Sequence, residues 1–451
     1  MIGPIARHDG TAWTVPVISR HDGTTWKPIQ GASAAPTTPP FAPDAGVTRS
    51  IATALGQGSS GATYGTTGQA THTNHTLLGN ADTLTLVWQI RTANMVSTTA
   101  TSEFRARIKS PSNGWQDVVF ADGATTATIP PASTYDIISK PIPGKWYAGE
   151  PVTVMAWSRT TGAGTGAASS QPTVPGVDPG AALNVTWEQA LTATPGGTAA
   201  LGLRPTFILG PSKTGASWLG VGDSITATVA EVHLDLAARL RGLPYSRAAQ
   251  GGEAHGYLIG GARYDARAGT ALRAGYVDSI IDAYGINDGY GDSTGATAIR
   301  NAAGFWKAAK ADGAKRIVQI TLPPAARSSD GYATLAGQTP THEHRVGYNR
   351  WLRDGAPMLG DTPATAGTTD PAAIRATVIK PDGTIVRGSS SHPLGEGWVT
   401  DCAAVTESSV DSGKFLPGLP RENYGDGLHF GGEFYRLAGE RLARDLKLMG
   451  F

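Results

Sequence analysis

Two kinds of hydrophobic pattern divide the chain, and the first is strand-like alternation. Apolar and polar residues alternate along Leu84–Ile90, Glu103–Lys109 and Pro151–Trp157, and turn signals such as Asp122-Gly123 separate these runs. A period of two places every second side chain on one face, as in a half-buried strand. Many short strands at this spacing predict an antiparallel β-sandwich, which we assign to residues 47–210.

From Trp218 onward, apolar runs of strand length alternate with runs of helical period. The predicted strands include Trp218–Val221, a second around 243–249, a third within 276–284, and Arg316–Leu322. The predicted helices are Thr226–Leu240, Ala296–Gly313, His344–Asp354 and a C-terminal helix on which Phe434, Leu437, Ala438, Leu442 and Leu446 form the apolar face. Alternating β and α units predict a parallel sheet between two layers of helices over residues 211–451. Arg375–Arg387 is typical of a hairpin turning at Pro-Asp-Gly, and we place it in an insertion of residues 360–400.

The N-terminal segment contains a short repeat. Ile5–Trp13 recurs as Ile18–Trp26, and each copy carries Asp-Gly between β-prone flanks, a hairpin signal. Two short strands cannot bury a core alone, so residues 1–31 are expected to pack on another subunit or a partner. Residues 32–46 are rich in Pro, Ala and Thr and predict a semi-rigid linker.

Composition excludes several classes of function. The 37 basic and 36 acidic residues nearly cancel, which argues against a nucleic-acid partner or an anionic membrane surface. Cys402 is the single cysteine, so neither an intrachain disulfide nor a cysteine metal site is expected. No run approaches the ~20 apolar residues of a membrane span, and Met1–Arg7 lacks the apolar core of a signal peptide. We therefore expect neither membrane insertion nor Sec export.

Five tryptophans in the predicted sandwich could serve either of two purposes. They are Trp88, Trp115, Trp146, Trp157 and Trp187. Such rings can line a sugar-binding face, but most of these lie inside strand patterns. We therefore favour core positions for them.

Candidate chemistry begins where the strand Trp218–Val221 ends in Gly-Asp-Ser. This position puts Ser224 at the carboxyl end of a parallel strand, where open α/β sheets place their chemistry. The start of a helix there also leaves backbone N–H groups available for an oxyanion. Taken alone, the triplet is more often a capped turn with Ser224 as the N-cap.

Three further groups follow other predicted strands or precede the last helix. Gly252 and Asn287 follow the second and third strands, and each could equally belong to a plain turn. Asp426 and His429 stand three residues apart, a spacing that lets the carboxylate orient the imidazole. Their alternative explanation is a helix cap by Asp426 beside a solvent-exposed His429. All these groups are predicted at one rim of one sheet.

Ser, Gly, Asn and His in this order resemble the SGNH (GDSL-type) serine hydrolase family over about residues 210–451. The blocks that match are Gly222-Asp223-Ser224, with Ile225 in place of the usual Leu, then Gly252, Gly285-x-Asn287-Asp288 and Asp426-x-x-His429. The resemblance implies a three-layer α/β fold, with the predicted β-sandwich and hairpin repeats as N-terminal additions.

The resemblance also implies a mechanism. Ser224 would be the nucleophile, His429 the base and Asp426 the residue that orients His429. The oxyanion hole would consist of the N–H groups of Ser224 and Gly252 and the side chain of Asn287, with Gly251 as an alternative to Gly252. No cofactor and no metal are implied. His342-Glu343-His344 could suggest ligation, but residues two apart on a helix point about 200° apart and cannot share an ion.

The Asp-Gly-Thr-x-Trp repeats resemble attachment segments of phage tail proteins. Together, the two resemblances imply a virion-associated serine esterase, an O-deacetylase or related carbohydrate esterase acting on host cell-surface polysaccharide. Such a protein would be made in the host cytoplasm and carried in the virion tail. It would contact other tail proteins through its repeats and form a homo-oligomer, for which tail symmetry suggests a trimer. The alternatives are a structural or receptor-binding tail protein with a vestigial hydrolase fold, or a lipase or acyl-esterase of the same family. The complete set of catalytic residues favours the enzyme.

Overall fold

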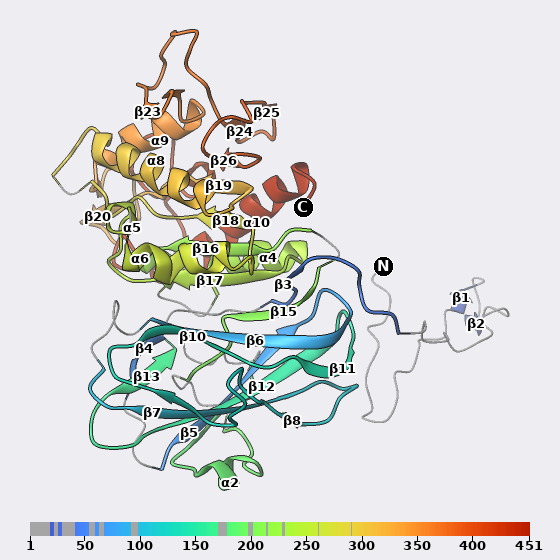
Figure 1. Ribbon diagram of the computed structural model, residues 1–451. Helices are drawn as coiled ribbons and strands as arrows, with labels where there is room; N and C mark the ends of the chain where they lie inside the picture. Colours follow the sequence, from blue (N-terminus) through green and yellow to red (C-terminus); the bar gives the residue numbers. More distant parts are fainter. Residues whose placement is uncertain are drawn as a thin grey trace. The chain divides into compact units, whose positions relative to one another are not determined.

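The computed structural model describes residues 19–21, 26–28, 41–53, 59–62, 67–91, 98–169, 178–196, 202–212, 215–227, 231–259, 261–289 and 291–451. The chain divides into two compact units, residues 1–41 and 42–451 (Figure 1). In the first unit, β1 (Ser19–His21) pairs antiparallel with β2 (Trp26–Pro28), with Arg20 opposite Lys27. These strands belong to the second copy of the repeat. The first copy, and residues 32–40 of the predicted linker, lie outside the described residues.

The second unit begins with two larger antiparallel sheets. The five-stranded sheet contains β3 (Thr48–Ser50), β6 (Ala81–Arg91), β10 (Thr134–Ile138), β11 (Ile142–Trp146) and β15 (Phe207–Pro211). The six-stranded sheet contains β5 (Gln69–Thr76), β7 (Ser102–Lys109), β8 (Gln116–Asp117), β9 (Ala127–Ile129), β12 (Pro151–Thr160) and β14 (Gly180–Leu183). A separate pair joins β4 (Ser59–Ala62) to β13 (Gly166–Ser169).

The predicted alternation explains the core that these two sheets share. Every second residue of β7, from Ser102 to Ile108, is buried. Phe104 packs edge-on against Trp88 of β6, with ring centroids 5.0 Å apart. Trp146 is also fully buried in this core, as the core interpretation predicts. Removing an aromatic ring of this size from a core typically costs about 3–5 kcal/mol.

Residues from Trp218 onward build a seven-stranded mixed sheet in the order β17-β16-β18-β19-β26-β24-β25. Its strands are β16 (Trp218–Gly222), β17 (Tyr245–Ala249), β18 (Ser279–Asp282), β19 (Arg316–Ile320), β24 (Thr377–Ile379), β25 (Ile385–Val386) and β26 (Trp398–Thr400). Neighbouring strands are parallel except β24 and β25. The hairpin predicted over Arg375–Arg387 is confirmed by the pairing of β24 with β25, and it forms the edge of the sheet because β24 also pairs with β26.

Helices pack on this sheet in two groups (Figure 1). In one, α10 (Gly432–Leu448) packs against α4 (His233–Arg241). In the other, α8 (Ala296–Ala311) packs against α5 (His255–Leu258) and α9 (His344–Arg353). The apolar face predicted for α10 is confirmed at Phe434, Ala438, Leu442 and Leu446, which are buried. Within the described residues, no helix has both the length and the apolar character needed to cross a bilayer.

The single helix predicted over 226–240 is wrong. α3 covers only Ser224–Ala227, and a new helix, α4, begins at His233. The second start is made locally, because the carboxylate of Asp235 accepts a hydrogen bond of 3.1 Å from the backbone N–H of Val232. A side-chain acceptor of this kind satisfies an N–H that a helix start leaves without a partner.

The antiparallel sheets and the mixed sheet are in contact within the second unit. The backbone N–H of Ser50 donates to the carbonyl of Tyr276 at 2.9 Å, and Arg49 forms an ion pair with Asp278. Phe207 of β15 also packs against Tyr276, with ring centroids 5.5 Å apart. The boundary predicted near residue 210 thus falls inside one compact unit.

Candidate active site

Ser224 lies where β16 gives way to α3. Glycine is required at position 222, since a Cβ there would lie 2.3 Å from the hydroxyl oxygen of Thr226. Asp223 makes the turn: its Oδ1 accepts from the N–H of Ile225 at 3.0 Å, and its carbonyl accepts from the N–H of Ala227 at 2.9 Å. The capping interpretation of Ser224 is therefore wrong, because Asp223 is the residue whose side chain caps the turn.

The structure brings Ser224, His429 and Asp426 together. Nε2 of His429 lies 2.7 Å from Oγ of Ser224, and Nδ1 lies 2.8 Å from Oδ2 of Asp426. Oδ1 of Asp426 also accepts from the backbone N–H groups of Leu428 and His429, at 2.9 and 2.7 Å. Asp426 thus closes a local turn and contacts the imidazole at once, although α10 begins only at Gly432.

This arrangement prepares the imidazole to act as a base. With Nδ1 donating its proton to a carboxylate, Nε2 is left as the acceptor for a hydroxyl proton. Burial raises the pKa of Asp426, but hydrogen bonds from His429 and Leu428 outweigh burial and lower that pKa to about 2. Asp426 is therefore ionised at neutral pH, as an orienting carboxylate must be.

The glycines predicted for the oxyanion hole lie in a turn beside Ser224. The N–H of Gln250 donates to the carbonyl of Gly222 at 3.0 Å, which ties this turn to the end of β16. A Cβ added to Gly251 would lie 3.8 Å from Cβ of Ser224, so Gly251 lies beside the serine. Gly252 has a φ of +75°, a conformation that favours glycine. The role of Gly252, or of Gly251, as oxyanion donor stays a prediction.

Asn287 is held against the same turn. Its Nδ2 donates to the carbonyl of Glu253 at 2.9 Å, and its side chain is half-buried. A side-chain amide carries two N–H donors, so this bond engages one of them. The N–H of Asp288 donates to the carbonyl of Gly285 at 3.2 Å, so the Asn-Asp-Gly turn is present as well.

Beneath the turn lies a buried cluster that sequence reasoning missed. Arg267 donates to both carboxylate oxygens of Glu253, at 2.6 and 2.9 Å, and the hydroxyl of Tyr284 donates to Oε2 at 2.8 Å. All three side chains are buried. The cluster fixes Glu253, whose carbonyl in turn receives Asn287.

A second buried cluster supports the Asn287 block from the other side. Nε2 of His255 lies 2.9 Å from Oδ2 of Asp282, and the backbone N–H of His255 donates to Oδ2 of Asp288 at 2.9 Å. Burial lowers the pKa of His255, but the charges and hydrogen bonds of Asp282 and Asp288 outweigh burial and raise that pKa to about 10. The available signal was Asp282, a carboxylate inside an apolar strand pattern, because buried carboxylates are rarely unpaired.

The surroundings of Asp223 disfavour the charged form of its carboxyl group. Its side chain is fully buried, and Oδ2 has no hydrogen-bond partner among the described residues. Burial raises the pKa of Asp223 to about 7; Asp288 and Asp282 add to this rise, while the Ile225 N–H and His255 oppose it. Asp223 therefore titrates near neutral pH in the folded protein.

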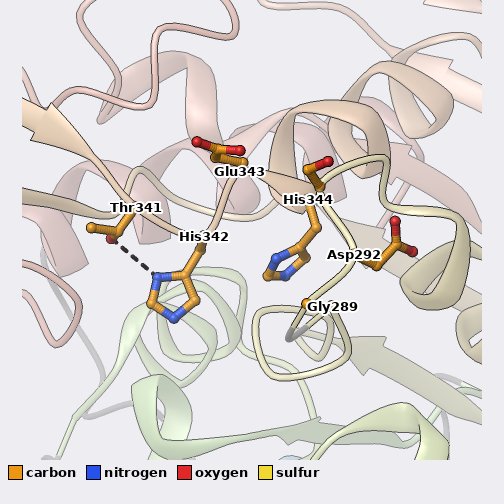
Figure 2. Close-up of a pocket in the computed structure, with 8 residues that line it drawn as sticks. Gly289, Asp292, Thr341, His342, Glu343 and His344 are labelled. Carbon is orange, nitrogen blue, oxygen red and sulfur yellow. Dashed lines mark hydrogen bonds between the residues drawn. The ribbon is translucent and has the colours of Figure 1, made fainter.

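A hollow of about 370 Å³ opens beside the Asn287 block (Figure 2). Its lining includes Gly289, Asp292 and the segment Thr341–His344. The wall runs toward the His429 loop: the Thr341 N–H donates to the carbonyl of Ala325, and the next residue, Ala326, donates to Gly427.

The two histidines of this hollow do not share a helix, so the assumption that His342 and His344 lie on one helix is wrong. α9 begins at His344, and the His342 and His344 rings lie 6.0 Å apart, edge to face. Burial lowers the pKa of both imidazoles, so they are neutral at pH 7. Among the described residues, no cluster of three or more His, Cys, Asp or Glu side chains could hold a metal ion.

Comparison with known proteins gives matches among solved structures alone. No model of a protein family matches the chain, and no curated protein matches it. One similar structure is a lipolytic protein of the G-D-S-L family from Desulfitobacterium hafniense DCB-2, with 12% identity, 51% of this chain and 99% of that chain covered, and a TM-score of 0.32.

Two further structures cover more of this chain. One is a Corynascus thermopiles carbohydrate esterase family 2 enzyme with a carbohydrate binding domain, with 14% identity, 90% and 100% coverage of the two chains, and a TM-score of 0.31. The other is a peptidoglycan O-acetylesterase, with 12% identity, 90% and 81% coverage, and a TM-score of 0.31. At TM-scores near 0.3 these similarities carry no functional assignment.

Proposed function

We propose that this chain is a serine esterase of the SGNH type, with Ser224 as nucleophile. One observation carries the proposal: His429 lies between Ser224 and Asp426, at 2.7 and 2.8 Å, in the order that serine hydrolysis requires. A second supports it, because Gly252, with Gly251 as the alternative, and Asn287 follow two other strands of the same mixed sheet.

The chemistry follows from this geometry. Oγ of Ser224 attacks the carbonyl carbon of an ester while Nε2 of His429 takes the hydroxyl proton. The tetrahedral oxyanion forms beside the 250–253 turn, where backbone N–H groups and the Asn287 amide stabilise its charge. His429 then gives its proton to the departing alcohol, and an acyl-Ser224 intermediate remains. Water, deprotonated by His429, attacks that intermediate, and the acid leaves as Ser224 regains its proton.

The hollow beside Asn287 offers polar groups to a carbohydrate ester. Its lining carries hydroxyl, carboxyl and imidazole groups, from Thr341, Asp292, Glu343 and two neutral histidines. Such groups suit the hydroxyls of a sugar, although apolar atoms make up the larger part of the exposed lining. We therefore assign the alcohol part of the substrate to a polysaccharide, with an O-acetyl or similar small acyl group.

The setting we propose is a phage tail acting on host cell-surface polysaccharide. It rests on the repeated Ile5–Trp13 and Ile18–Trp26 segments, and it includes contact with other tail proteins and a homo-oligomer, for which we propose a trimer. Deleting residues 1–31 is expected to prevent incorporation into particles while esterase activity is kept. Loss of activity together with the segment would place the repeats in the catalytic unit instead.

The deciding experiment compares the parent chain with Ser224→Ala and, as control, Ser391→Ala, an exposed serine outside the site. Hydrolysis of p-nitrophenyl acetate and acetate release from purified host envelope polysaccharide are both measured. We expect Ser224→Ala to lose roughly 10³-fold or more in kcat, with Ser391→Ala unchanged. A Ser224→Ala variant as active as the parent would overturn the nucleophile assignment. A parent that hydrolyses neither substrate would favour the structural or receptor-binding alternative.

A further inference from the structure

The outer face of the six-stranded sheet carries a polar hollow that contains none of the candidate active-site residues around Ser224. In the register of β7, β12 and β5, Lys109 lies opposite Thr153, Arg107 opposite Met155, and Met155 opposite His72. Residues directly opposite each other point to the same side of a sheet. Their neighbours along the strands, such as Ile108 and Val154, are buried in the core between the two sheets, so this row faces outward.

The row surrounds a hollow of about 260 Å³. His72 and Met155 come from the sheet itself, while Trp115 and the segment 190–195, which follows α2 (Trp187–Ala190), supply other parts of the lining. The tryptophans of this region therefore divide by face: Trp88 and Trp146 are fully buried, whereas Trp115 is partly exposed at the hollow. The core interpretation is wrong for Trp115.

His72 brings a ring nitrogen without a hydrogen-bond partner to the hollow. The residue is 6% exposed, and its Nε2 has no hydrogen-bond partner among the described residues. Burial, followed by the charge of Lys109, lowers the pKa of His72 to about 4, so its ring is neutral. A buried ring nitrogen without a partner is unfavourable unless a ligand or water satisfies it.

The charged side chains of the lining favour a negatively charged ligand. Nζ of Lys109 lies 4.8 Å from the centroid of the Trp115 ring, and the Arg107 guanidinium lies 5.6 Å from it. Nε of Arg107 is 2.7 Å from Asp117, whereas Lys109 forms no ion pair with any described residue. Among the residues that the structure describes, no carboxylate lines the hollow, and the nearby Asp178 is paired with Arg204 at 2.9 Å.

We propose that this hollow binds an anionic sugar unit of a polysaccharide. Lys109 and Arg107, which both lie over the Trp115 ring, receive its carboxylate or phosphate, and His72 hydrogen-bonds to a hydroxyl, while the indole of Trp115 holds the two cations in place. One aromatic ring with two cations suits a single charged sugar, and the near-neutral chain offers no extended basic track for a nucleic acid. The proposal does not rest on the esterase chemistry of Ser224.

Isothermal titration of the full chain at low salt tests this site with three probes: polygalacturonate, its methyl ester and glycerol-phosphate teichoic acid. We expect binding to at least one anionic polymer, and polygalacturonate to bind at least about tenfold more tightly than its neutral ester if carboxylate is the group recognised. Lys109→Gln and Trp115→Ala should each weaken binding about tenfold. The control Lys145→Gln, an exposed lysine on the other sheet, should bind as the parent does.

Hydrolysis of p-nitrophenyl acetate is measured for every variant to check that the chain is folded. If Trp115→Ala loses that activity, only the binding of Lys109→Gln is used to judge the proposed site. Three outcomes would each overturn the proposal. In the first, the parent binds neither anionic polymer; in the second, it binds the methyl ester as tightly as polygalacturonate and does not bind teichoic acid. In the third, Lys109→Gln and Lys145→Gln weaken binding equally. A parent that binds but does not hydrolyse would overturn the esterase and leave this site standing.

Discussion

Nε2 of His429 lies 2.7 Å from Oγ of Ser224, although 205 positions separate the two residues in the sequence. Each is held by its own local structure: Ser224 by the turn at the end of β16, and His429 by the Asp426 turn ahead of α10. The packing of α10 against α4 joins the two ends of the α/β region and brings the turns together. The following predictions test what each contact contributes.

Asp426→Asn should lower kcat by roughly 10²–10⁴ with little change in KM, because the neutral amide can no longer hold and stabilise the imidazolium. The pKa of Asp426 is about 2, so this carboxylate stays ionised from pH 5 to pH 9 and the loss should persist across that range. Steady-state kinetics as a function of pH measure the effect. Asp382→Asn is the matched control, since Asp382 closes an exposed turn by the same type of hydrogen bond, from Thr384 at 2.9 Å.

Asn287→Ala should lower kcat by about 10²–10³, the usual cost of one lost oxyanion donor. It should also destabilise the fold by about 1 kcal/mol, because the bond to the Glu253 carbonyl is lost. Kinetics and urea unfolding separate the two effects. Asn301→Ala, which removes a bond of 2.8 Å to Asp288, should lower stability with a much smaller change in kcat. An Asn287→Ala variant with normal kcat would reduce Asn287 to a structural tie.

Glu253→Gln should destabilise the protein by about 3–5 kcal/mol, because it leaves the buried guanidinium of Arg267 without its counter-charge. Urea unfolding measures this free energy. Glu231→Gln provides the control: Glu231 pairs with Arg239 at 2.8 Å, but both side chains are about half exposed, and such a pair contributes less than about 1 kcal/mol. Equal effects of the two substitutions would show that Glu253 is not buried as described.

Asp223→Asn should change how stability depends on pH. The folded-state pKa of Asp223 is about 7, above its ordinary value of 3.8, so the folded protein holds a proton that the unfolded chain releases. The parent therefore loses stability as pH rises from about 4 to about 7, on the order of a few kcal/mol, and the slope ends above that window. Asn keeps an acceptor for Ile225 and has no proton to lose. Unfolding free energies of both proteins at pH 5 and pH 8 test this; a difference between them that does not vary with pH would contradict the raised pKa.

Much of the fold followed from local pattern. Strand alternation located β6, β7 and β12, and helical periodicity located α8, α9 and α10 to within a few residues. The short strand β26 (Trp398–Thr400) was not predicted, since three residues leave no readable period. The interruption between α3 and α4 was missed for a similar reason, because the capping bond from Val232 to Asp235 does not disturb the apolar spacing.

The sequence by itself determined the residues that define the candidate site: Ser224, Asn287, Asp426 and His429 stand in turns whose local chemistry is legible from Gly, Asp and Asn. Tertiary structure decided how those turns meet, that Asp223 and not Ser224 caps its turn, and that Gly251 lies beside the serine. It alone decided the buried partners of Glu253 and His255 and the division of the tryptophans between core and surface. The physical reason is one of range. Hydrophobic period fixes which face of an element is buried, whereas the partner that covers the face or neutralises a charge comes from a distant segment.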